Sequence, residues 1–249
     1  MTKIFFLGTN GWYPSETGHT TCSLIDAPEA YIILDAGTGI LNIDRLISED
    51  KPIFLFLSHL HFDHIYGLHI LNKFKFKQGL NIVLHDKNYK PLMNIFRQPF
   101  TVAPKDLPFD VNFKILNDGR DESFPFGLVC LEQIHSSPCF GFRFEFINKV
   151  ITYCTDTGIC PAIFELARDS DLLITECALL PNETNATWPH MNPTDSAECA
   201  KSANCKQLAL IHFDAEKYAS IKIREYAIKE TKKKFRNSFL AKDGAQLII

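Results

Sequence analysis

The chain has 249 residues, 46% of them hydrophobic, and its 26 Lys and Arg residues against 29 Asp and Glu residues leave a formal net charge of −3. This charge argues against nucleic acid or an anionic membrane as the main partner, and the apolar content excludes a disordered chain. No apolar run approaches the roughly 18 residues that a membrane helix needs, and the first residues lack the pattern of a secretory signal. We therefore expect a cytoplasmic, globular protein without a membrane partner.

The predicted elements alternate between strands and helices along the chain. Apolar and β-branched runs bounded by Gly, Pro and Asn predict strands at 4–7, 22–26, 31–35, 53–57, 113–116, 126–134, 140–147, 149–154, 171–176, 207–212 and 238–249. Helical patterns occupy residues 64–72, 88–97, 159–169, 194–203 and 215–230. Residues 98–112, rich in Pro and aromatic side chains, predict an irregular loop over one end of the fold.

No internal repeat and no low-complexity linker divides the sequence, so we expect residues 1–249 to form a single domain. The strands fall into two groups with helices in both, which two back-to-back sheets covered by helices would accommodate. The eight cysteines include no C-x-x-C pair. Together with the missing secretory signal, this predicts reduced and mostly buried thiols.

Four potential metal ligands follow the apolar run at 53–57 within six residues, in the order His59, His61, Asp63 and His64. In an extended segment residues i and i+2 project to the same side, so His59 and His61 can converge on one ion. Asp63 and His64 fall at the turn into the next helix and can face a second ion about 3.5–4 Å away. A surface cluster would bring like charges together on protonation, so we interpret the segment as a metal centre.

The H-x-H-x-D-H pattern of this segment resembles that of the metallo-β-lactamase superfamily. The resemblance extends to three residues at the ends of predicted strands: His135, Asp156 and His212. It implies an α/β fold, the αββα sandwich of two β-sheets flanked by helices. It also implies two divalent ions, one on His59, His61 and His135, the other on Asp63, His64 and His212, with Asp156 bridging. Five imidazoles and two carboxylates suit Zn²⁺ or Mn²⁺ and would not make a Ca²⁺ site.

A narrower resemblance, to the ribonuclease Z branch of phosphodiesterases, rests on the run from Thr175-Glu176-Cys177-Ala178 through His190 to Ile211-His212-Phe213. A carboxylate that binds one imidazole nitrogen fixes the tautomer and makes the other nitrogen a proton donor. In that branch such a pair holds the phosphate and protonates the leaving oxygen. The resemblance therefore implies that Glu176 and His190 are catalytic, and Asp63 is expected to orient the attacking hydroxide.

The chain departs from this branch in one respect. Ribonuclease Z enzymes generally carry a long, glycine-rich, basic arm that binds tRNA, often between the equivalents of His135 and Asp156. Here 20 residues separate these two positions, and two predicted strands occupy them. We therefore expect a small phosphodiester substrate, a cyclic nucleotide or a cyclic sugar phosphate. The alternatives are a tRNA 3′-processing endoribonuclease, a glyoxalase-type lactonase or thioesterase, which shares the ligands but needs no Glu176–His190 pair, and a non-catalytic nucleotide-binding protein.

Two basic stretches bear on nucleic-acid binding. Residues 73–77 alternate Lys and Phe, which favours either a strip for stacking and phosphate contact or, as we prefer, an exposed strand edge protected by lysines. Residues 232–234 are three lysines at the end of a predicted helix, where cations suit the helix dipole and solvent exposure is expected.

The remaining features leave alternatives open. His19, in a predicted turn, is equally compatible with the site and with the scaffold, whereas His69 and His85 are expected to be structural or superficial. Phe100 and Phe109 in the 98–112 loop could cap a base or a sugar. Homodimerisation is common in this branch and would fit a helix after His64 that keeps exposed apolar residues.

Overall fold

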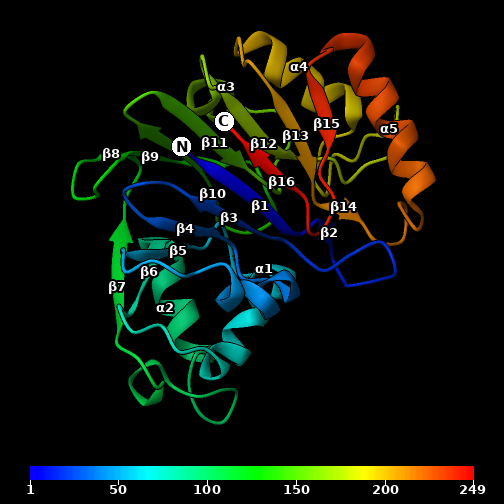
Figure 1. Cartoon of the computed structure of the whole chain (residues 1–249). Helices are drawn as coiled ribbons and strands as arrows, with labels where there is room; N and C mark the ends of the chain where they lie inside the picture. The colour runs from blue at the N-terminus through cyan, green and yellow to red at the C-terminus, as the bar shows by residue number, and fades with distance from the viewer.

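The structure, a computed structural model of residues 1–249, is built on two seven-stranded sheets (Figure 1). The strands of the first are β1 (Lys3–Gly8), β3 (Cys22–Asp26), β4 (Tyr31–Leu34), β5 (Ile53–Phe56), β6 (Leu80–His85), β7 (Val111–Leu116) and β16 (Gln246–Ile248). Those of the second are β8 (Gly119–Asp121), β9 (Gly127–Gln133), β10 (Cys139–Phe146), β11 (Lys149–Cys154), β12 (Leu172–Glu176), β13 (Leu208–Ile211) and β15 (Ser238–Leu240). The short β2 (Asn10–Gly11) and β14 (Phe213–Asp214) pair with each other.

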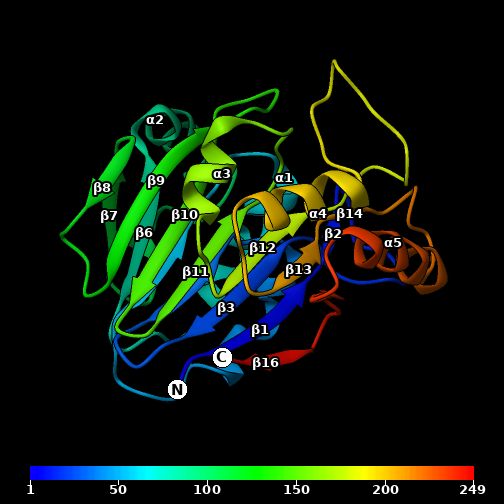
Figure 2. The same cartoon turned by 90° about the horizontal axis from the view of Figure 1, so that it is seen from above.

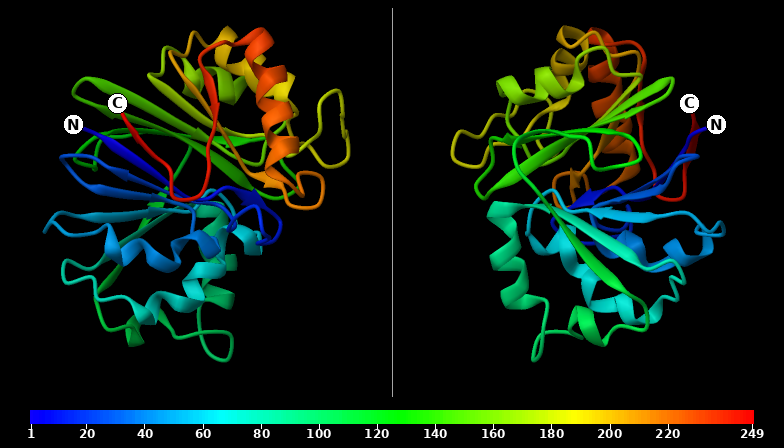
Figure 3. Two further views of the ribbon diagram at one scale, coloured as in Figure 1. Left: turned by 45° about the vertical axis from the view of Figure 1, so that its right-hand side comes forward. Right: turned by 90° about the vertical axis from the view of Figure 1, so that its left-hand side faces the viewer.

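Helices cover the outer face of each sheet (Figure 3). The α-helices are α1 (Phe62–Ile65), α2 (Asp86–Ile95), α3 (Pro161–Ala167), α4 (Pro193–Ser202) and α5 (Ile221–Lys234), and 3₁₀ turns occupy Thr38–Arg45, Tyr66–Lys73 and Pro104–Asp106. The strand orders are β16-β1-β3-β4-β5-β6-β7 and β15-β13-β12-β11-β10-β9-β8. The predicted α/β class and its αββα layering are therefore confirmed.

Strand β5 is apolar along its whole length because both of its faces are buried. Phe54 and Phe56 belong to the core between the two sheets, where Phe56 packs edge-on against Phe144 at 4.9 Å. Ile53 and Leu55 point the other way, into the core between the first sheet and its helices. Because both faces of the strand are covered, no position is free for a polar side chain. This packing fixes the point at which the chain leaves the sheet and enters the segment of His59.

The parallel pairing of strands determines where the candidate functional residues lie. Strands β4, β5, β6 and β7 run parallel in the first sheet, as do β11, β12, β13 and β15 in the second. The antiparallel pairs β9–β10 and β10–β11 give β9 the same direction as β11. Within each sheet the carboxyl ends of these strands therefore lie at one edge, where loops rather than regular structure present side chains.

The predicted element boundaries differ from the structure in several places. The helix expected at 64–72 is one turn of α-helix, α1, continued by the 3₁₀ helix Tyr66–Lys73. The helix expected from 215 begins at Ile221, because the preceding residues form β14 and a turn. The strand expected at 238–249 is two strands, β15 and β16, which belong to different sheets. The 3₁₀ helix Thr38–Arg45 was not among the predicted elements.

Our preferred interpretation of residues 73–77, an exposed strand edge, is wrong, and the stacking strip is excluded as well. Phe74 and Phe76 are buried, and their rings stack at 5.2 Å beneath the first sheet. Phe109 packs against Phe76 at 5.1 Å in the same core. The aromatic side chains of Phe74, Phe76 and Phe109 therefore belong to the hydrophobic core and not to the surface.

The thiols agree with the prediction, since all eight cysteines are buried and unpaired. Residues 232–234 close helix α5 with their lysines exposed, also as predicted. None of the helices combines the length and the apolar character that crossing a lipid bilayer requires.

Candidate metal centre

The predicted ligands all lie at the shared edge of the two sheets. His59 and His61 follow β5, and Asp63 and His64 lie in the single turn of α1. The other three come from the second sheet, His135 after β9, Asp156 after β11 and His212 directly after β13. Segments separated by up to 153 positions are thus brought to one point, and the ligand atoms form two overlapping groups.

The first group consists of His59, His61, His135 and Asp156, whose ligand atoms lie within 4.8 Å of one another. Oδ2 of Asp156 lies 3.7 Å from Nε2 of His59 and 4.0 Å from Nε2 of His135. Nδ1 of His61 is 3.3 Å from Nε2 of His135. Three imidazole nitrogens and one carboxylate oxygen therefore surround a single point.

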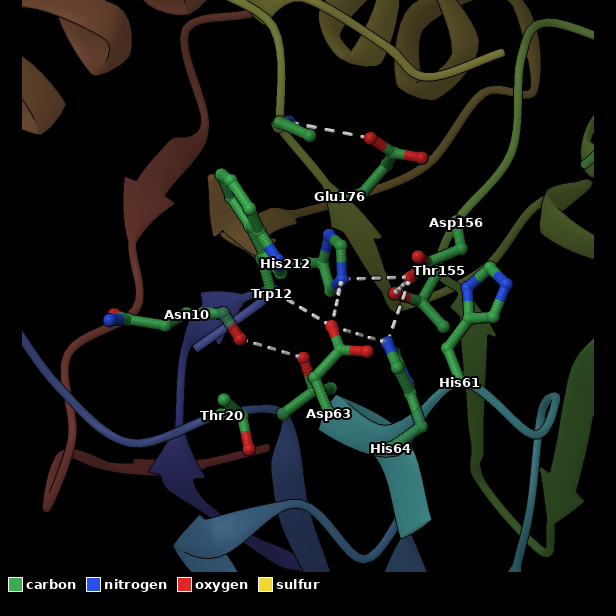
Figure 4. A network of polar contacts seen from close by, with 12 residues as sticks. Asn10, Trp12, Thr20, His61, Asp63, His64, Thr155, Asp156, Glu176 and His212 are labelled. Carbon is green, nitrogen blue, oxygen red and sulfur yellow. Dashed lines mark hydrogen bonds and ion pairs between the residues drawn. The ribbon is translucent and has the colours of Figure 1, made fainter. Parts of the chain in front are cut away.

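The second group uses the other oxygen of the same carboxylate. Oδ1 of Asp156 lies 3.2 Å from Nε2 of His64 and 3.1 Å from Nε2 of His212. Oδ2 of Asp63 lies 3.3 Å from Nε2 of His212 and 3.5 Å from Nε2 of His64. Figure 4 shows these four side chains pointing toward one another. Asp156 thus faces each group with a different oxygen, as a bridging ligand does.

The residues fit two divalent cations. Nε2 of His59 and Nε2 of His64 are buried without a hydrogen-bond partner, although buried polar atoms are almost always paired. Burial lowers the pKa of His59 well below its usual value and that of His135 to about 4. Neutral imidazole is the form that binds a metal. A donor set of imidazoles and carboxylates suits borderline metals such as Zn²⁺ and Mn²⁺.

Asp35 holds two of the histidines in place, and the sequence did not identify it. Its Oδ1 accepts a hydrogen bond from the Ser58 amide at 2.7 Å, and its Oδ2 accepts from Nδ1 of His64 and the Ser58 hydroxyl, both at 2.8 Å, and from the Tyr153 hydroxyl at 2.6 Å. Ser58 Oγ lies 3.0 Å from Nδ1 of His59. A carboxylate only accepts, so both Nδ1 atoms carry the proton and both Nε2 atoms are left for a metal. The only sequence signal was a charge at the end of the apolar run at 31–35.

Backbone strain is concentrated at the same edge. Asp35, Asp156 and His212 have φ values of 56°, 49° and 50°, in the left-handed region, which costs roughly 1–3 kcal/mol for a residue other than glycine. Gly11 approaches His212 so closely that a Cβ would lie 2.5 Å from Cε1 of the imidazole. The fold thus accepts unfavourable conformations in order to aim these side chains.

Glu176 and His190 form a buried pair beside the second group. Nδ1 of His190 lies 2.8 and 3.0 Å from the two carboxylate oxygens of Glu176, which also accepts from the Thr157 amide at 2.6 Å. Burial opposes protonation of His190, but the charge of Glu176 outweighs it and raises the pKa to about 9. His190 also lies within 4.8 Å of Asp156 and His212, measured between ligand atoms. The pair can therefore present a proton to a group bound at the metal centre.

A cavity of about 580 Å³ opens over these residues. Its base contains His61, Asp63, Asp156, His190 and His212. Its walls contain Gly11, Trp12, Phe62, Ala178, Leu179, Asn185, Trp188, Asp214 and Lys217. Trp12 and Trp188 in these walls were not predicted, because they come from loops whose position the sequence pattern does not specify.

The other candidates lie elsewhere. His19 is exposed, its amide donates to Asp243, and it does not line the cavity. His69 is exposed near Thr101, and His85 is buried against Phe140 at the start of α2. No residue of 98–112 lines the cavity, so the suggestion that this loop caps the site is wrong.

Comparison with known proteins gives a family match. The family model of the Beta-lactamase superfamily domain matches residues 30–213. The probable metallo-hydrolase YhfI of Bacillus subtilis (strain 168) is 23% identical over 219 residues, covering 84% of this chain and 86% of the relative. Ribonuclease Z of Geobacillus kaustophilus is 22% identical over 308 positions, covering 99% of each. Since this chain has 249 residues, that alignment includes segments of the ribonuclease without a counterpart here.

Solved structures agree on the fold. The crystal structure of YhfI has a TM-score of 0.82 at 22% identity and covers 99% of this chain and 98% of its own. The short form of human tRNase Z has a TM-score of 0.75 at 20% identity, with 99% of both chains covered. A diphosphatase from the PhnP family has a TM-score of 0.74 at 18% identity, covering 100% of this chain and 98% of its own. At these identities the likeness establishes a shared fold.

Proposed function

Because this chain belongs to the β-lactamase superfamily and is a metal-dependent hydrolase, we propose that it hydrolyses a small phosphodiester, either a cyclic nucleotide or a cyclic sugar phosphate. The observation that carries the proposal is the buried Glu176–His190 pair beside Asp156 and His212. Breaking a phosphodiester expels an alkoxide, which needs a proton. A lactonase or thioesterase with the same seven ligands has no need of this pair.

The chemistry divides between the metals and the protein. When bound by the seven ligands, two Zn²⁺ or Mn²⁺ ions lower the pKa of a water and offset the charge of the phosphate. Asp63, held through its Oδ2 by the Trp12 amide at 2.7 Å, orients the attacking water. Glu176 fixes Nδ1 of His190, so Nε2 faces the leaving oxygen and delivers its proton there. The raised pKa of His190, about 9, keeps the imidazole protonated at neutral pH.

Two features favour a small substrate over a polynucleotide. Lys217 is the single lysine in the cavity lining, which contains no arginine, and its ammonium already pairs with Glu183. A polyanion bound along this face would meet few cations, in keeping with the net charge of −3. The cavity volume of about 580 Å³ also falls in the range of small-molecule sites. The relatives named ribonuclease Z make tRNA 3′-processing the second candidate.

The test is a panel of a cyclic mononucleotide, bis(p-nitrophenyl) phosphate, a precursor tRNA and a lactone, assayed with added Mn²⁺ or Zn²⁺. The informative variants are His190→Ala and Glu176→Gln, with the exposed His69→Ala as the matched control. A general acid contributes about 10²–10⁴-fold, so we expect His190→Ala to lower kcat on the cyclic nucleotide by at least about a hundredfold.

A comparison of two leaving groups makes this test specific for proton donation. The p-nitrophenolate anion departs without a proton, so its ester should lose far less activity in the His190→Ala variant than the cyclic nucleotide does. A loss within about threefold on the cyclic nucleotide would contradict the role of His190 as general acid. Faster turnover of the precursor tRNA or of the lactone would replace the proposed substrate class by the corresponding alternative.

A further inference from the structure

Both tryptophans of this chain lie in the cavity wall, and both are exposed. Trp12 is 62% and Trp188 46% exposed, beside Phe62 at 76%. Large aromatic side chains gain most from burial. Exposed apolar surface that lines one cavity and is bordered by polar residues commonly marks a binding site. These three side chains therefore point to a ligand with a flat apolar part.

Trp12 adopts a backbone conformation that is unfavourable for a bulky residue. Its φ is 71°, in the left-handed region where a bulky residue is strained and glycine is not. The ring contacts Tyr13 edge-on at 5.0 Å and is otherwise largely in solvent. The contact with Asp63 uses only the Trp12 amide, which any residue except proline would supply. Neither folding nor the metal centre explains an indole at this position.

Trp188 is held beside the reacting centre by its own loop. The segment 177–192 joins β12 to α4 and projects from the body of the protein (Figure 2). Within it, the Asn185 side chain accepts a hydrogen bond from the Trp188 amide at 3.0 Å. The indole lies parallel to the His61 ring, at 6° and 5.8 Å between centroids, and edge-on to His135 at 5.7 Å. The ring is thus pre-positioned directly over the first ligand group.

We propose that Trp12 and Trp188 form a nucleobase-binding platform, so that the preferred substrate is a phosphodiester of a nucleoside and not of a sugar alone. The inference rests on the proposed phosphodiesterase function and selects between its two substrate classes. Every base offers a π-face, so stacking on aromatic side chains tolerates different bases. The one lysine of the lining is engaged with Glu183, which leaves aromatic contact as the main means of holding the part of the substrate that does not react.

A matched pair of substrates isolates the nucleoside. Thymidine 5′-(p-nitrophenyl phosphate) and methyl p-nitrophenyl phosphate are both singly charged diesters with the same leaving group, and they differ in the nucleoside alone. Stacking of one base contributes about 5- to 150-fold, so kcat/KM should favour the thymidine ester by a factor in that range. In Trp188→Ala and in Trp12→Gly this ratio should fall at least about fivefold. The exposed Tyr226 on α5 provides the control variant, Tyr226→Ala, which should keep the wild-type ratio.

Two further measurements separate binding from folding. Glycine adopts the left-handed conformation without strain, so Trp12→Gly should keep or raise the thermal midpoint while lowering the substrate ratio. Because both tryptophans line the cavity, fluorescence excited selectively at tryptophan, and not at the seven tyrosines, reports on the cavity alone. Thymidine 5′-monophosphate should quench this fluorescence saturably, and ribose 5-phosphate should not.

The outcomes distinguish the two proposals. Equal kcat/KM for the two esters, unchanged in both tryptophan variants, would overturn the nucleobase platform and leave the phosphodiesterase function intact. If neither these two esters nor a cyclic mononucleotide is hydrolysed with Zn²⁺ or Mn²⁺, the phosphodiesterase function fails. The fluorescence titration then decides the platform by itself, since equal quenching by the nucleotide and the sugar phosphate would refute it.

Discussion

The substitution Asp35→Asn tests whether the Asp35 carboxylate orients the histidines of both candidate metal positions. Asp35 is fully buried and directly holds Nδ1 of His64, and it holds Nδ1 of His59 through the Ser58 hydroxyl. Asparagine has nearly the same shape but replaces one oxygen by an amide that donates. The substitution therefore changes the hydrogen-bond pattern around the histidines and leaves their packing almost unaltered.

Neither orientation of the asparagine satisfies its neighbours. If its oxygen takes the place of Oδ2, its amide faces the Ser58 amide, which lies 2.7 Å from Oδ1, and two donors meet. If it is flipped, its amide faces Nδ1 of His64, which must then accept and so transfers its proton to Nε2. Nε2 is the atom that faces Asp156, and once protonated it cannot bind a metal.

The expected loss of metal affinity can be taken from the usual effect of removing a group that hydrogen-bonds to a metal ligand. Removing them typically weakens metal binding 10–100-fold, which corresponds to about 1.4–2.7 kcal/mol. A bound metal stabilises the fold in proportion to the logarithm of its affinity. For each ion that is weakened, the rise in thermal midpoint on adding metal should therefore shrink by about 3–11 °C in a chain of this size.

The assay combines calorimetric titration of the metal-free protein with Zn²⁺ or Mn²⁺ and thermal unfolding with and without metal. Ser58→Ala interrupts only the path to His59 and should weaken one ion, whereas Asp35→Asn should weaken both. Tyr153→Phe removes a different donor to the same carboxylate, at 2.6 Å, and should leave both affinities within about threefold. Two unchanged affinities in Asp35→Asn would refute the reasoning.

Three other predictions concern the surroundings of the site. Gly11→Ala places a Cβ against the His212 imidazole, so it should displace that ligand and lower metal affinity at least about tenfold in the same titration. Arg224 is buried and donates to Thr9, Asn10 and Thr17. Arg224→Met should lower the free energy of unfolding in urea by about 3 kcal/mol, against less than about 0.5 kcal/mol for the exposed Lys232→Met. Since all eight cysteines are buried, a thiol reagent should modify none in the native protein and all eight in guanidinium.

The residues that the sequence identified share a local signature. Three histidines and an aspartate within six positions need only the geometry of a strand end to converge. Predicted strand ends also marked His135, Asp156 and His212, because parallel strands deliver their carboxyl ends to one edge of the sheets. The structure brings these seven side chains together, and it brings Glu176 to His190. Such features can be predicted from the sequence because regular secondary structure fixes their spacing.

What the sequence did not reveal depends on contacts between distant segments. Tyr153 donates to Asp35 across 118 positions, and no pattern in either strand indicates that contact. Composition predicted an irregular segment at 98–112 but did not show over which part of the fold it lies. In the structure Phe109 from this segment packs under the first sheet, while the aromatic cover of the site comes from Trp12 and Trp188. Loop placement follows from packing, which single-sequence patterns do not encode.

The division between strand ends and loops also bears on how substrate choice can change on this fold. The ligands sit at strand ends fixed by both sheets, whereas Trp12 and Trp188 sit on loops that can vary without disturbing the core. Yet neither loop is independent of the chemistry, because the Trp12 amide holds Asp63 and the loop of Trp188 also carries His190. A substrate that stacks on these rings would therefore restrain the segments that hold Asp63 and carry His190, the residues that we propose orient the attacking water and donate the proton. Recognition at the rim and bond cleavage at the base are then coupled through the backbone of two short segments.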